Sequence, residues 1–105
     1  MRIAIAQINC TVGDITGNVA KIIDAVRQAK TAGAELVITP ELAISGYPPS
    51  DLLLRETFCQ ACAAGLMELV KAVGDITLVV GHPNFEEGKL YNAASVIHQG
   101  KIIHT

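Results

Sequence analysis

Hydrophobic residues along this chain alternate between short continuous runs and stripes with helical spacing. Compact apolar runs at residues 3–8, 36–39 and 76–80 are typical of buried strands. Two stripes that repeat every three or four residues lie between these runs and predict amphipathic helices. The first stripe contains Val19, Ile22, Ile23, Val26 and Ala29, and the second contains Phe58, Cys62, Leu66, Leu69, Val70 and Val73.

The order strand, helix, strand, helix, strand predicts an α/β fold with parallel strands joined by right-handed crossovers. Asn18 is placed to cap the start of the first helix. Gly33 and Gly74 stand where the two helices are expected to end, because glycine is common just past a helix. No internal repeat or linker interrupts the pattern, so the chain is predicted to be one unit.

The last part of the chain predicts an antiparallel hairpin. Apolar runs at residues 93–97 and 101–104 flank Gln99-Gly100, which is typical of a two-residue turn. With that turn, the register places His104 opposite Ser95, and His98 and His104 face opposite sides of the sheet. A metal shared by these histidines is therefore not expected.

The segment after the second strand carries the main candidate for chemistry. Residues 40–55 read PELAISGYPPSDLLLR and place Glu41 directly after the strand at residues 36–39. Ligands of open α/β sheets gather at the carboxyl ends of strands, and partial burial there would make a carboxylate a stronger base. The alternative interpretation is an ordinary glutamate in the first turn of a helix, stabilised by the helix dipole.

Residues 46–49, with the sequence GYPP, predict a rigid turn that presents Tyr47 and Asp51 in fixed directions. Tyr47 then either contacts a ligand or packs its ring over the edge of the core. Asp51 most simply caps or begins the short apolar run at residues 52–54.

Composition narrows the class of protein. The chain has 105 residues, half of them hydrophobic, with 4% aromatic residues and a net charge of -2, which does not indicate a nucleic-acid partner. No apolar run approaches the roughly 20 residues that span a bilayer, and no signal peptide precedes the first strand. Three cysteines are an odd number and do not complete a disulfide framework, so a cytoplasmic location is expected.

The cysteines offer few sites. Cys59 and Cys62 form a C-x-x-C pattern, but Cys62 falls on the buried helical stripe, so core thiols are the preferred interpretation, and no zinc site is expected. Cys10 ends the first strand, where it is either a structural residue or a nucleophile near Glu41. The glycines match neither a P-loop nor a dinucleotide fingerprint, so this chain is not expected to bind ATP by itself.

Three segments together resemble a known family. PELAISGYPPSDLLLR, the opening IAIAQINCTVGDITGN and the later LVVGHPNFEEGKLYNAASVIHQGKI are similar to the N-terminal amidase domain of bacterial glutamine-dependent NAD synthetases. This domain belongs to the nitrilase or carbon-nitrogen hydrolase superfamily. The resemblance covers residues 1–105 and implies the N-terminal part of a nitrilase-like α-β-β-α sandwich, with the synthetase domain absent.

The resemblance also implies a catalytic triad of glutamate, lysine and cysteine. Glu41 matches the general base, and Tyr47 lies in the family turn beside the glutamine pocket, where it is expected to contact substrate. The lysine and the nucleophilic cysteine of the family come later than Thr105, and Lys101 is too early to be that lysine. The chain is therefore expected to supply one member of the triad and to be inactive alone.

The implied full enzyme releases ammonia from glutamine and passes it to a synthetase domain that amidates deamido-NAD. ATP and magnesium are expected only for that domain, and a homo-oligomer is expected for the full enzyme. Two alternatives remain: another amidase, nitrilase or carbamoylase of the superfamily, or a non-enzymatic α/β module. Half a sandwich leaves an apolar face and a strand edge uncovered, so we expect the isolated chain to self-associate or be poorly soluble.

Overall fold

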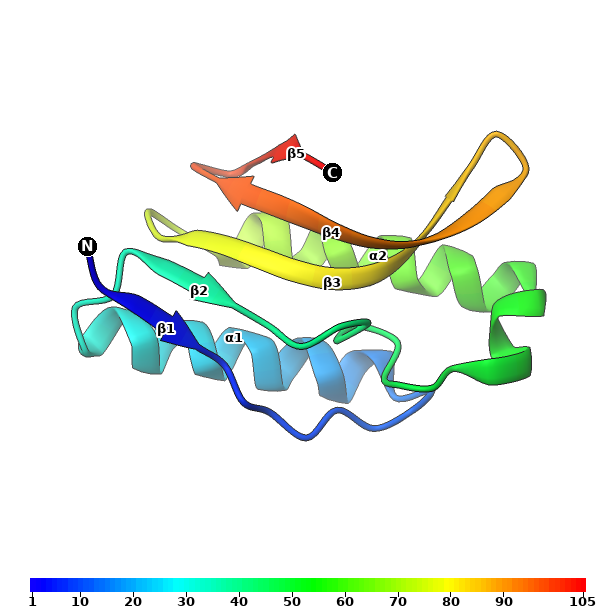
Figure 1. The fold of residues 1–105 in the computed structure, drawn as a ribbon, viewed down its shortest axis with the longest axis horizontal. Coiled ribbons are helices and arrows are strands. Elements are labelled where there is room, and N and C mark those ends of the chain that lie inside the picture. Colours follow the sequence, from blue (N-terminus) through cyan, green and yellow to red (C-terminus); the bar gives the residue numbers. More distant parts are fainter.

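A five-stranded sheet and two helices form two layers in the computed structural model, which describes residues 1–105 (Figure 1). The predicted α/β architecture is confirmed. The strands lie across the sheet in chain order: β1 (Ile3–Ile5), β2 (Leu36–Ile38), β3 (Thr77–Glu86), β4 (Lys89–His98) and β5 (Lys101–His104). The helices are α1 (Ile15–Thr31), α2 (Glu56–Ala72) and the short 3-10 helix η1 (Ser50–Leu54).

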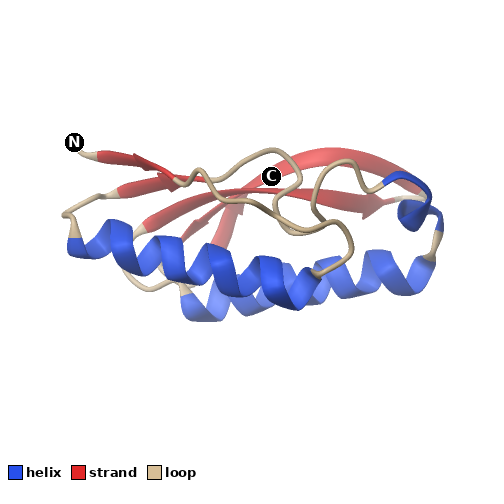
Figure 2. Ribbon diagram, turned by 90° about the horizontal axis from the view of Figure 1, so that it is seen from below, coloured by secondary structure: helices blue, strands red, loops and turns tan.

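The first three strands are parallel, and the last two are antiparallel to their neighbours. Val37 lies at the centre of the parallel part, where it pairs with Ala4 of β1 and Leu78 of β3. Two right-handed crossovers that advance in the same direction across a sheet place both helices on one face. Figure 2 shows α1 and α2 side by side below the sheet, so its other face carries no helix.

The core lies between the helices and the sheet, and it contains both predicted helical stripes except Ile23 and Phe58, which are half-buried and pack against it. A cluster of 17 buried residues includes Val19, Ile22, Val26 and Ala29 from α1 and Cys62, Leu66, Leu69 and Val70 from α2, packed with Val37, Leu78, Val80 and Ile97 of the sheet. Most of the stability of such helices comes from this apolar packing. No helix in the structure combines the length and the apolar character needed to cross a membrane.

The ends of the helices differ in one respect from the sequence-based prediction. Asn18 was expected to cap α1, but the cap is Asp14, whose Oδ1 accepts a hydrogen bond of 3.0 Å from the Gly17 N–H. Asn18 lies within the helix and is buried instead. The predicted stop is confirmed, because Gly33 follows the helix with a φ of +81°.

The strands also depart from the predicted bounds. β1 ends at Ile5 rather than at residue 8, whereas β3 runs on to Glu86. A two-residue turn at Glu87-Gly88, with φ values of +51° and +77°, joins β3 to β4 and was not predicted from the sequence. The second turn at residues 99–100 is confirmed, with φ values of +49° and +73°.

The register of the last hairpin is not the predicted one. His98 pairs with Lys101 as expected, but a bulge at Val96/Ile97 places His104 opposite Val96 rather than Ser95. Ser95 instead forms a side-chain hydrogen bond of 2.9 Å with Thr105. Because a bulge inserts one extra residue in a strand, pairing by simple counting fails beyond it.

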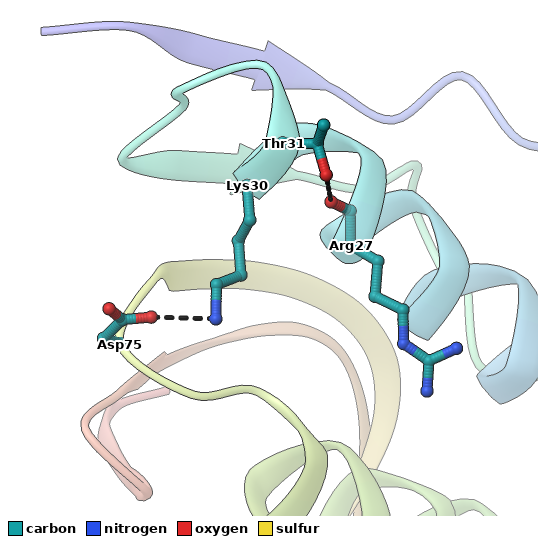
Figure 3. Close-up of polar contacts among 4 residues, drawn as sticks. All are labelled: Arg27, Lys30, Thr31 and Asp75. Atoms are coloured by element: carbon teal, nitrogen blue, oxygen red, sulfur yellow. Dashed lines mark hydrogen bonds and ion pairs between the residues drawn. The ribbon is translucent and has the colours of Figure 1, made fainter.

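An ion pair joins the two helical crossovers at the end of the sheet where β2 and β3 begin. Lys30, near the end of α1, lies 2.9 Å from the Asp75 carboxylate, and Thr31 donates to the Arg27 carbonyl over 3.1 Å (Figure 3). The hydrogen bond from Lys30 lowers the pKa of Asp75. The Lys30 and Asp75 side chains are both exposed to solvent, at 44% and 89%, so the pair contributes little to stability.

The helix-free face of the sheet is apolar. Side chains alternate between the two faces, so the burial of Val37 beneath the helices directs Ile38 to the other side. Ile3, Ile5 and Ile38 are 51%, 76% and 37% exposed there. β1 also has a free edge, because it is the first strand of the sheet. An apolar face beside an unpaired edge favours association with another surface.

We therefore expect the isolated chain to self-associate and the Ile5→Glu variant to do so less, because a charge on the helix-free face opposes apolar contact. Sedimentation velocity at a series of concentrations measures this. Met67→Glu is the matched control, since Met67 is an exposed apolar residue of α2, on the other layer. A monomeric wild-type chain at all concentrations would contradict the expectation.

Candidate active site

Residues 41–45 form a turn, which we call the post-β2 turn, at the carboxyl end of the parallel strands. Three of its side chains are anchored in the protein, because Leu42 is 6% exposed and Ala43 and Ile44 are fully buried. Leu42 has a φ of +50°, in the left-handed region that allows the chain to reverse direction. These anchors fix the backbone at Glu41, while the Glu41 side chain itself is exposed.

Hydrogen bonds tie the post-β2 turn, and Thr39 just before it, to β3. The Gly81 N–H donates to Thr39 Oγ1 over 3.1 Å, and the Ile44 N–H donates to the Gly81 carbonyl over 3.2 Å. A Cβ atom on Gly81 would lie 2.6 Å from the Pro40 carbonyl oxygen and from the Leu42 nitrogen. Only glycine therefore fits at this point of β3 without a shift of the turn.

Buried Asn18 joins the post-β2 turn to the loop that follows β1. Its side-chain amide donates to the carbonyls of Thr11 and Ile44, over 2.8 and 3.0 Å, and its Oδ1 accepts from the Thr11 N–H over 2.7 Å. A backbone hydrogen bond of 3.0 Å from Gly13 to Ser45 runs alongside. All of the hydrogen-bonding groups of this buried amide are thus used to hold two loops together.

The segment that follows the post-β2 turn is closely packed at Gly46. Gly46 has a φ of +80°, and a Cβ there would lie 2.6 Å from the backbone of Val12, so the expectation of an unusual backbone at this glycine is confirmed. The Tyr47–Pro48 peptide bond is cis. The Tyr47 side chain is 63% exposed and makes no hydrogen bond, so it does not pack over the core edge. Asp51 lies in the first turn of η1.

Glu41 lies beside β4, where Asn92 Nδ2 donates a hydrogen bond to Glu41 Oε1. Sequence reasoning predicted a partly buried carboxylate, and this was wrong, because the side chain lies on the uncovered side of the sheet and is exposed. Sequence reasoning also missed Asn92. The turn at Glu87-Gly88 was the available signal, since it pairs Asn92 of β4 with Pro83 of β3, the strand that neighbours β2.

None of the three cysteines makes a hydrogen bond with Glu41. Burial raises the pKa of Cys10, partly offset by Lys21, and burial together with Cys59 raises the pKa of Cys62 to about 11. A raised pKa disfavours the reactive thiolate. The Cys59 thiol donates to the Leu53 carbonyl over 3.4 Å. All three thiols are free, and the prediction that Cys62 is a core residue is confirmed.

No histidine makes a hydrogen bond with another histidine or with Glu41. His82 is 2% exposed and its Nε2 lies 2.7 Å from Ser95 Oγ, while its Nδ1 lies 3.1 Å from the Pro83 carbonyl. Because a carbonyl only accepts, Nδ1 carries the proton and Nε2 accepts from Ser95. His98 contacts Thr77 instead. No group of three or more His, Cys, Asp or Glu side chains is placed to hold a metal ion.

The geometry and the sequence agree with one family of enzymes. The family model of carbon-nitrogen hydrolases matches residues 2–105, which is nearly the whole chain. The chain therefore belongs to the carbon-nitrogen hydrolase family.

Within this family the chain is similar to glutamine-dependent NAD(+) synthetases. That of Xanthomonas campestris is 45% identical over 103 residues, which are 97% of this chain and 19% of that protein. The crystal structure of the synthetase from Cytophaga hutchinsonii has a TM-score of 0.92 and 33% identity, covering 97% of this chain and 18% of that one. The resemblance to the N-terminal part of these synthetases, inferred from the sequence, is confirmed.

An amidase provides a second comparison. A variant of the Nesterenkonia sp. AN1 amidase, in which a glutamate is replaced by leucine, has a TM-score of 0.82 and 29% identity, covering 98% of this chain and 40% of that one. The nitrilase-like fold expected from the sequence is thus confirmed by two kinds of relative. The chain spans about a fifth of the length of the curated synthetases that it matches.

Gly81→Ala should lower the free energy of unfolding by about 2 kcal/mol, because the added methyl group forces the post-β2 turn away from β3. Urea denaturation measures this. Gly74→Ala is the control, since a Cβ there would meet only the flexible end of Lys30, at 3.3 Å, and a small change is expected. Equal effects of the two substitutions would contradict the close contact at Gly81.

The free energy of unfolding should fall as the pH drops below about 6.5, the ordinary pKa of histidine. Burial lowers the pKa of His82, so the unfolded chain binds a proton more readily than the folded chain in the range between the two pKa values. Urea denaturation at about pH 7.5 and about pH 5.5 measures the difference. His82→Gln should reduce it and His104→Gln, at an exposed position, should not.

Proposed function

We propose that this chain forms the N-terminal part of the glutaminase domain of a glutamine-dependent NAD synthetase. The proposal is carried by the close match to synthetases in both sequence and structure, with 45% identity to one and a TM-score of 0.92 to another. The amidase match is weaker on both measures, with 29% identity and a TM-score of 0.82. This difference favours the synthetase over another amidase of the superfamily.

In the proposed reaction Glu41 is the general base. A cysteine thiol attacks the side-chain amide carbon of glutamine, and Glu41 takes the thiol proton as the carbon-sulfur bond forms. The carbon-nitrogen bond then breaks, and Glu41 returns the proton to the departing ammonia. Water finally hydrolyses the thioester. The exposed position of Glu41, at the carboxyl end of β2 and on a rigidly held turn, suits this exchange of protons.

The nucleophile and the lysine that stabilises the developing oxyanion come, in this proposal, from sequence outside the present residues. Cys10 and Cys62 are not assigned this role, because neither thiol makes a hydrogen bond with Glu41 and burial raises the pKa of both. Covalent addition of the acetamide moiety of fluoroacetamide at the active-site cysteine is seen in the Nesterenkonia amidase variant. An attack by a cysteine is therefore chemically reasonable for this family, and the isolated chain should be inactive.

The ammonia is used, we infer, by a separate synthetase domain that binds ATP and magnesium and amidates deamido-NAD. The present residues do not fit those ligands, because they contain neither a phosphate-binding glycine loop nor a cluster of metal ligands. Tyr47 projects from the segment after the post-β2 turn and is proposed to contact glutamine. We also infer a cytoplasmic homo-oligomer, and free thiols agree with a reducing compartment.

Glu41→Gln should lower glutamine-dependent NAD formation by about 100- to 10,000-fold, because it removes the general base. The test uses a chimera in which this chain replaces the matching residues of the Xanthomonas campestris synthetase. NAD formation driven by added ammonia should persist, since it bypasses the glutaminase step.

Glu35→Gln is the matched control, because Glu35 flanks the other end of β2 and is exposed like Glu41. It should leave both activities unchanged. Full glutamine-dependent activity in the Glu41→Gln chimera would sink the assignment of Glu41. A wild-type chimera active with ammonia but not with glutamine would count against the proposed function itself.

A further inference from the structure

The hydrogen bond between Asn92 and Glu41 joins two parts of the chain that lie 51 positions apart. Glu41 follows β2, whereas Asn92 belongs to β4, and β3 separates the two strands. The carboxylate therefore meets the amide across the width of β3. The structure provides no other hydrogen bond and no ion pair for the Glu41 side chain, so Asn92 is its one polar partner.

The ladder between β3 and β4 fixes the place of Asn92. Asn92 pairs with Pro83 and Ala94 with Gly81, and the register continues without a bulge to the pair of Ile97 with Leu78. Ser95 is buried on the helix side, so alternation along the strand places Asn92 on the helix-free side. Gly81 gives the post-β2 turn room to approach from that same side.

A carboxylate held by one donor has a defined direction. The Asn92 amide donates a hydrogen bond to Oε1 of Glu41. Oε2 makes no hydrogen bond, so this oxygen is available to accept a proton. An asparagine suits this task, because it donates a hydrogen bond without adding a charge that would weaken the base. Hydrogen bonds with β3 and with Asn18 of α1 fix the backbone of the post-β2 turn. Asn92 of β4 orients the Glu41 side chain.

We propose that Asn92 is a positioning residue that orients the Glu41 carboxylate for its role as general base. This inference rests on the proposed function, since it assumes that Glu41 exchanges a proton with substrate and nucleophile. Asn92 acts through Glu41 and need not touch glutamine. Asn92 thereby sets the geometry of proton transfer by Glu41, and the rate of the chemical step is sensitive to that geometry.

Asn92→Ala in the chimeric synthetase should lower kcat with glutamine by about 10- to 100-fold and leave KM close to the wild-type value. Ammonia-driven NAD formation should not change. Asn84→Ala is the matched control, because Asn84 lies on the same β3–β4 ribbon, faces the other side of the sheet and makes no side-chain hydrogen bond. It should behave as wild type.

Asn92→Asp separates positioning from a purely structural role. The aspartate has nearly the size of asparagine, so a structural role predicts a milder effect than that of alanine. Positioning predicts a larger loss of kcat, because a second carboxylate repels Glu41 instead of holding it. A wild-type kcat for Asn92→Ala, or a milder loss for Asn92→Asp than for Asn92→Ala, would overturn the inference.

A measurement on the 105-residue chain itself does not depend on the proposed function. The NMR signals of the Asn92 side-chain amide should follow the protonation of Glu41 and lose that dependence in Glu41→Gln. If the wild-type chimera lacks glutamine-driven activity, the proposed function fails, and this signal still decides whether Asn92 holds Glu41. An Asn92 amide signal insensitive to Glu41 would refute the contact.

Discussion

The contact between the post-β2 turn and Gly81 decides where every other group of the candidate site lies. The absence of a side chain at Gly81 lets the turn come close enough for the Ile44 N–H to donate to the Gly81 carbonyl, while the Gly81 N–H donates to Thr39 just before the turn. That approach buries Leu42, Ala43 and Ile44, and their burial fixes the path of the chain at Glu41. Asn18 secures the same turn from the side of α1. The Glu41 side chain is exposed, but its backbone is held in place by the buried residues that follow it.

The one-sided sheet follows from the direction of the two crossovers. Because both advance the same way across the sheet, both helices cover the same face, and the isoleucines of β1 and β2 are left uncovered on the other. Glu41 and Asn92 lie on the uncovered side as well. The apolar surface and the candidate catalytic groups therefore share one face, so whatever covers that face also encloses Glu41. Enclosure would strengthen the hydrogen bond from Asn92.

The local pattern of the sequence predicted much of the fold. Both helices lie where the apolar stripes place them, Gly33 ends α1, and Gln99-Gly100 forms the predicted turn. The predictions were wrong where a residue makes contacts with parts of the chain far away in sequence. Asn18 resembles a helix cap in sequence, but its amide donates to the carbonyls of Thr11 and Ile44, and Asp14 caps the helix instead. His104 is displaced by a bulge that simple pairing does not anticipate.

The sequence by itself determined the class of fold, the carbon-nitrogen hydrolase family and the position of Glu41 at the end of a strand. These depend on periodicity and on motifs that lie within a few residues of one another. Only the tertiary structure decided that Glu41 is exposed and that Asn92 is its partner. Both facts depend on the pairing of β3 with β4 and on the packing of a turn against Gly81. Such contacts join residues tens of positions apart, so they cannot be predicted from the sequence pattern around either residue.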